Sequence, residues 1–82
     1  MTDTKLTQTS LPTRYTVEDR ATGQAIGTVE RHTYYGVPRW HARYGDPASR
    51  RTQSVLPSAA DRGLWGTRRS AVAVIAIMHQ ES

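Results

Sequence analysis

Cationic and imidazole side chains alternate along one short segment of the chain. Arg39, His41 and Arg43 stand two residues apart within the sequence RWHARY. On a strand such residues project from one face, and the chain rises about 3.3 Å per residue. The two guanidinium groups can then span successive phosphates or reach guanine acceptors in a major groove. The same alternation also fits a solvated strand face that stays charged to prevent edge association.

A second segment faces this one if Gly36 and Val37 form the centre of a turn. Pro38 supports such a break because it cannot donate a hydrogen bond to a strand ladder. Cross-strand neighbours then follow from the register. The expected pairs are Tyr34 with Arg39, His32 with His41, and Glu30 with Arg43. Tyr34 would add a hydrogen-bonding or stacking group to the basic face, and His32 a second imidazole.

Two further arginine pairs are candidates for phosphate contacts. Arg68 and Arg69 follow Thr67, which is a good helix N-cap residue. Cations oppose the dipole at a helix N-terminus, so a pair there favours a phosphate clamp. The alternative is that their long stems cover apolar surface while their heads stay in water. Arg50 and Arg51 follow the RWHARY segment and could add non-specific contacts.

Catalytic and metal chemistry have few candidate residues. The three histidines are His32, His41 and His79, and no carboxylate stands where it would complete a zinc site. A nucleophile with a base and an orienting group cannot be assembled from the remaining polar residues. We therefore expect a protein that is not an enzyme and that holds no metal or cofactor.

The length and charge of the chain limit the remaining possibilities. Eighty-two residues make one domain at most, and the net charge of +4 favours a polyanionic partner. Residues 1–12 hold five Thr or Ser and are expected to form a disordered tail. Residues 13–80 are expected to form the single domain. The longest apolar run has eight residues, so no membrane segment is expected, and without a secretion signal the expected location is cytoplasmic.

The strand signals come before a single helix signal. Residues 14–19, 25–35 and 39–44 have β-branched and aromatic content, separated by Gly-containing turns. Residues 52–57 fit either a short fourth strand or an extended crossover. After the Thr67 cap, Ala71, Val74, Ile75 and Met78 recur at helical spacing, although the β-branched residues of this run also suit a strand.

Strand pairing divides the side chains into two faces. Pairing Tyr15 with Val29 puts their side chains beside Trp40 and Tyr44 on an apolar face, which the C-terminal helix is expected to cover. Ile26 falls on the polar face, where it would mark a bulge or an apolar contact. The predicted fold is therefore α+β: a three-stranded antiparallel sheet, with a possible short fourth strand, packed against one C-terminal helix.

This β-β-β-α order resembles the AP2-type and integrase amino-terminal DNA-binding domains. The resemblance rests on Gly27, on RWHARY with Arg39 and Arg43 outward and Trp40 inward, and on the GTRRSA helix start. It covers residues 14–79 by topology and implies a sheet laid in the major groove. It also implies a stand-alone module, such as a small phage or plasmid accessory protein. The helix start is similar to that of double-stranded-RNA-binding domains too, but that match is partial because no helix precedes the first strand, so DNA is expected before RNA.

A protein-interaction module is the competing prediction. The run AVAVIAIM is apolar on nearly all sides of the expected helix. One face of a sheet cannot cover that much apolar surface. An exposed flank would serve a homodimer, with Val72, Ile77 or Leu64 at the contact, or a host protein that a phage-type inhibitor or regulator would bind.

Overall fold

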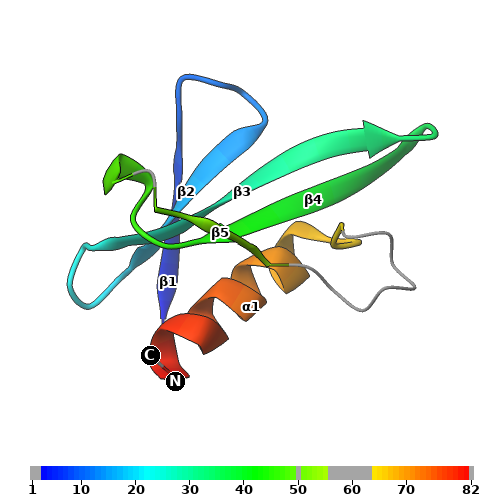
Figure 1. The fold of residues 1–82 in the computed structure, drawn as a ribbon. Coiled ribbons are helices and arrows are strands. Elements are labelled where there is room, and N and C mark those ends of the chain that lie inside the picture. Colours follow the sequence, from blue (N-terminus) through cyan, green and yellow to red (C-terminus); the bar gives the residue numbers. More distant parts are fainter. Residues whose placement is uncertain (1–2, 50, 56–63, 82) are drawn as a thin grey trace.

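The structure, a computed structural model, describes residues 3–49, 51–55 and 64–81. Within these residues it contains five strands, a short 3-10 helix and one α-helix (Figure 1). In chain order they are β1 (Thr4–Gln8), β2 (Arg14–Asp19), β3 (Ala25–Tyr34), β4 (Val37–Tyr44), η1 (Pro47–Ser49), β5 (Gln53–Val55) and α1 (Arg68–Glu81). The strands hydrogen-bond in chain order and every neighbouring pair is antiparallel, so the sheet is a meander.

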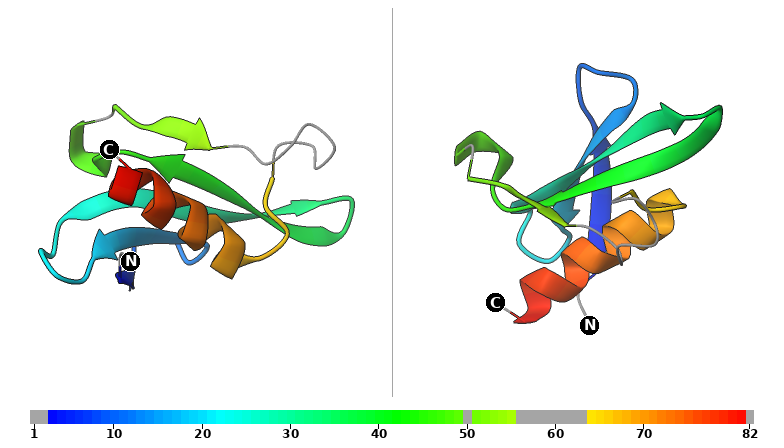
Figure 2. Two further views of the ribbon diagram at one scale, coloured as in Figure 1. Left: turned by 90° about the horizontal axis from the view of Figure 1, so that it is seen from below. Right: turned by 45° about the vertical axis from the view of Figure 1, so that its right-hand side comes forward.

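Helix α1 crosses one face of the sheet and leaves the other face uncovered (Figure 2). It packs mainly on β4 and β3, and its buried residues are Ala71 and Ile75. The core side chains between the two layers are Val17, Ile26, Val29, Ala42, Ala71 and Ile75. The α+β class with a C-terminal helix is thus confirmed, but the sheet has five strands where the sequence predicted three or four.

The first additional strand comes from the segment that was expected to be a disordered tail. Residues 4–8 form β1, which pairs antiparallel with β2 along its whole length. Leu6 lies opposite Val17 and packs on the core cluster from its edge. Thr and Gln side chains dominate β1, so the sequence has no alternation of apolar and polar residues there that would predict a strand. The exposed edge of β2 supplies the hydrogen-bond partners that this polar segment needs.

Strands β2 and β3 pair in the expected register, with Val17 opposite Gly27. Beyond Val17 the register shifts, because β3 has one extra residue at a β-bulge. The bulge turns Ile26 toward α1, where its side chain is only 3% exposed. Ile26 therefore does not lie on the polar face, where the sequence predicted it, but the bulge and the apolar contact expected for it are both present.

The turn between β3 and β4 lies one residue earlier than expected. Tyr35 and Gly36 have φ values of 52° and 76°, which is the pattern of a two-residue type I′ hairpin turn. The expected pairs are therefore replaced by Tyr34 with Val37, His32 with Arg39, and Glu30 with His41. The observed partner of each β3 residue thus lies two positions earlier in β4 than predicted. Because side chains alternate with a period of two, those of Glu30, His32, Arg39 and His41 stay on their expected face.

The predicted division into a covered and an uncovered face is confirmed. Trp40 and Tyr44 are half-buried and pack against the core beneath α1, whereas Arg39 is exposed. The Trp40 ring lies 6.2 Å from that of Tyr15, centroid to centroid. Gly27 lets the helix approach closely, since a Cβ atom there would lie 2.9 Å from Cγ2 of Ile75.

The far edge of β4 has two short partners. Residues 53–55 form β5, which resolves the choice between a strand and a crossover in favour of a strand. Trp65 then bridges Trp40 through two backbone hydrogen bonds of 2.7 Å. Its indole N–H donates to the Val55 carbonyl at 2.8 Å. The chain leaves this bridge and enters α1 with Thr67 as N-cap, whose Oγ1 accepts from the Ser70 N–H at 3.1 Å.

Candidate nucleic-acid interface

The uncovered face of the sheet, here called the open face, carries the alternating residues of β4. Trp40 and Ala42 point toward α1, so Arg39, His41 and Arg43 project from the opposite side. His32 of β3 joins them, with its ring centroid 6.0 Å from that of His41. The structure therefore brings these four predicted residues together on one surface.

Glu30 is the acidic residue at the centre of this surface, and its partners differ from those expected. Its carboxylate contacts Nη2 of Arg14 at 3.2 Å and Nε2 of His32 at 3.3 Å. Arg43 was the expected partner, but the observed register places His41 opposite Glu30 instead. Arg14, which was not among the predicted site residues, thus neutralises the carboxylate. Pairing Tyr15 with Val29 already implied this contact, because it sets Arg14 opposite Glu30.

The two remaining arginines of the open face keep their charge available. Within the described residues neither Arg39 nor Arg43 forms an ion pair. Nη1 of Arg43 donates to Oγ1 of Thr52 at 3.4 Å, a long and weak hydrogen bond. Beside Arg43 lies a shallow cavity of about 150 Å³, lined by Arg14, Thr28, Glu30, His41, Arg43, Pro47 and Thr52.

His41 is the partly buried imidazole of the open face. Its Nε2 lies 3.1 Å from Oγ of Ser54, so the ring is held in place by β5. Partial burial lowers the pKa of His41 below 6.5, and the charges of Arg43 and His32 lower it further. Glu30 acts in the opposite direction but does not cancel these effects. A proton on His41 is therefore disfavoured until an anion comes close.

The end of the β3–β4 hairpin extends beyond its neighbours as a two-stranded arm (Figure 1). Strand β2 pairs with β3 only as far as Glu30, and the last bridge to β4 on its other side is at Trp40. Among the described residues, the strand segments within His32–Arg39 therefore form ladder pairs only with each other, and we call His32–Arg39 the arm. Its tip residue, Tyr35, is 83% exposed. The arm was not predicted, because its length depends on where the pairing of β3 with β2 and of β4 with Trp65 ends.

Arg68 and Arg69 do not share the open face. The guanidinium carbon of Arg68 lies 5.3 Å from the Tyr15 ring centroid and 5.9 Å from that of Trp40. Both rings are on the helix side of the sheet, so Arg68 lies on the covered side, whereas the guanidinium of Arg39 reaches the edge of the sheet near Gly66, where a Cβ atom would lie 3.3 Å from its Nη1. Phosphate contacts by Arg68 and Arg69 therefore stay a prediction, and they would be made from the covered side of the sheet. The aromatic contacts instead agree with the alternative that the Arg68 stem covers apolar surface.

The other predicted positions contribute less to this surface. Tyr34 ends β3 beside the turn, where its backbone pairs with Val37. Arg51 is exposed ahead of β5, and its backbone N–H donates to Oγ of Ser49 at 3.3 Å. Arg50 lies outside the described residues.

Within the described part of the chain, no group of three or more His, Asp or Glu side chains is placed to hold a metal ion. No helix among the same residues combines the length and apolar character needed to cross a membrane. Comparisons with family models, with curated proteins and with solved structures found no match.

Proposed function

We propose that the chain is a binding module for duplex nucleic acid, DNA before RNA, and that it carries out no chemistry. The observation that supports this most is the pair Arg39 and Arg43 on the open face, both without a carboxylate partner among the described residues. With Glu30 held by Arg14 and His32, the positive charge of the two arginines is available to phosphates.

The arm supports DNA over RNA. The major groove of B-DNA admits a two-stranded β-ribbon, and the arm is such a ribbon. Arg39 lies at its base and Arg43 four residues further along the same face, where they could contact phosphates beside the groove. The deep, narrow major groove of an RNA helix would not admit this ribbon. In this proposal the sheet binds as the resemblance to AP2-type domains implies, with two further strands.

A titration with labelled duplex DNA tests this proposal. Replacing Arg39 and Arg43 together with Ala should leave the circular dichroism and thermal unfolding unchanged, since both side chains are exposed. Affinity should fall by about tenfold or more. Arg20→Ala is the matched control, because Arg20 lies at the opposite end of β2 from Arg14. Equal binding by the double variant and the wild type would refute the proposal.

A protein-interaction module is the second candidate. Its support is the flank of α1, where Ile77 is 54% exposed. The same titration separates the two functions, because binding driven by apolar contacts would be retained in the Arg39/Arg43 variant and would change little with salt.

A further inference from the structure

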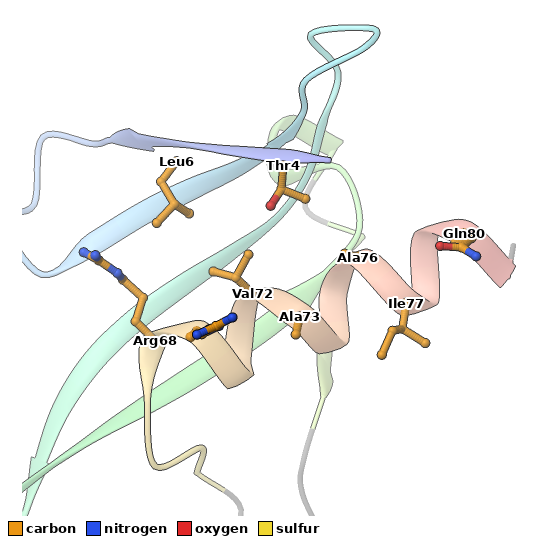
Figure 3. Close-up of a pocket in the computed structure, with 9 residues that line it drawn as sticks. Thr4, Leu6, Arg68, Val72, Ala73, Ala76, Ile77 and Gln80 are labelled. Carbon is orange, nitrogen blue, oxygen red and sulfur yellow. The ribbon is translucent and has the colours of Figure 1, made fainter. Parts of the chain in front are cut away.

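An apolar groove runs between α1 and β1 on the covered side of the sheet (Figure 3). Its volume is about 630 Å³. Leu6 and Thr4 form one wall, and one flank of α1 forms the other. The helix residues that line it are Arg68, Arg69, Val72, Ala73, Ala76, Ile77 and Gln80. We propose that this groove binds a second copy of the chain, with the two α1 helices packed antiparallel.

The order of residues on this flank is self-complementary. A two-fold axis passing between Val74 and Ile75 would bring each groove-lining residue of α1 against a residue of complementary character on the second α1. The resulting pairs are Val72 with Ile77, Ala73 with Ala76, Arg69 with Gln80, and Arg68 with Glu81. Apolar residues meet apolar residues at the centre, and the arginines meet polar and acidic residues at both ends. An interface of this kind, in which both copies use the same patch, is the usual form of a symmetric dimer.

The charges at the two ends of α1 support this arrangement independently. Arg68 and Arg69 begin the helix, no acidic residue is present in its first turn, and Glu81 ends it. Each of these charges opposes the dipole of its own helix. In an antiparallel pair, the arginines lie beside the C-terminus of the second helix and Glu81 beside its N-terminus. The charges that are unfavourable in one copy are then favourable in two.

The remaining basic residue of the last turn points elsewhere. His79 is part-buried, and its Nε2 lies 3.1 Å from Oδ2 of Asp19 in β2. It therefore binds the helix to its own sheet and takes no part in the flank. At the centre of the flank, Ala73 and Ala76 have short side chains, so the axes of two helices can approach to about 8–10 Å.

Sedimentation equilibrium of the whole chain provides the first test. The wild type should form a dimer, and Ile77→Lys should weaken self-association by about thirtyfold or more because it buries an unpaired charge. Val37→Lys is the matched control, since Val37 is 47% exposed at the arm and lies away from the groove. A wild type that stays monomeric at its solubility limit would overturn the proposal. Equal dimerisation by Ile77→Lys would overturn it too.

Charge exchange provides a second test that distinguishes a dimer contact from a folding defect. Arg68→Glu and Glu81→Arg each improve the match with the helix's own dipole, which for Arg68→Glu offsets the loss of the contacts with Tyr15 and Trp40 in the monomer. Each change alone should weaken the dimer, since like charges then meet across the axis, and the double variant should recover it. Failure of the double variant to recover would contradict the antiparallel pairing. Association with a different protein, but not with a second copy of the chain, would contradict it as well.

Discussion

His41 responds to the electrostatic environment of the open face through its pKa. The lowered pKa means that the folded chain binds fewer protons than the unfolded chain as the pH falls below 6.5. Its contribution to stability is full above 6.5 and declines as the pH falls through the lower folded value. Urea unfolding at about pH 7.5 and about pH 5.5 should show a smaller loss of stability for His41→Gln than for the wild type. A larger loss for His41→Gln would contradict the lowered pKa.

The same residue predicts how binding depends on pH. Burial is the largest cause of the lowered pKa of His41, and the charges of Arg43 and His32 add to it; a phosphate near the ring would offset these charges. Complex formation should then take up a proton, so that duplex affinity rises as the pH falls. His41→Gln should remove most of this dependence in titrations at matched ionic strength. The wild type and His41→Gln would show the same pH dependence if no phosphate came near the ring.

Gly27 lies where both α1 and the neighbouring strand β4 come close to β3. A Cβ atom there would lie 2.4 Å from the Arg43 carbonyl oxygen as well as 2.9 Å from Ile75. A backbone oxygen cannot move aside as a side-chain end can, so Gly27→Ala should cost about 1–3 kcal/mol or more. Gly23→Ala is the comparison, because its φ is 74° but nothing lies within 4 Å of its Cβ position. It should cost about 1 kcal/mol, from backbone strain alone. Equal costs in urea unfolding would refute the packing argument.

The helix and the three central strands could be predicted from the sequence because their signals are local. Thr67 caps α1 as expected, and its Oγ1 satisfies the Ser70 N–H. Thr67→Ala should therefore cost about 1 kcal/mol in chemical unfolding, whereas Thr67→Ser should cost much less. If Ser destabilised the chain as much as Ala, the hydroxyl would not be what caps the helix.

Register and edge strands could be predicted less well, since both depend on partners distant in sequence. The turn at Tyr35 and Gly36 shifted the β3–β4 pairing by two residues, which kept the faces but gave Glu30 a different partner. A shift of one residue would have turned Arg39 toward α1. Strand β1 was missed because its residues are polar and its hydrogen bonds come from β2. The open-face residues of the candidate site were thus predicted, but their contacts were not.

In the whole molecule, the two proposed surfaces lie on opposite sides of the sheet. The open face has Arg39 and Arg43, and the groove between α1 and β1 has Arg69 and Ile77. Because the sheet separates them, a dimer formed through α1 would leave both open faces accessible. The Ile77→Lys variant should therefore keep the duplex affinity of a single open face, as measured at concentrations where the wild type is also monomeric. Loss of binding at that dilution would show that the two surfaces are not independent.

The salt dependence of duplex binding tests the central claim most directly. Each phosphate contact contributes about −0.9 to the slope of log K against log salt concentration. Arg39 and Arg43 together predict a wild-type slope of about −2 or steeper, and the Arg39/Arg43 double Ala variant should be flatter by about two units. Arg20→Ala should keep the wild-type slope. A wild-type slope near zero, or one that the double variant leaves unchanged, would contradict binding through the open face.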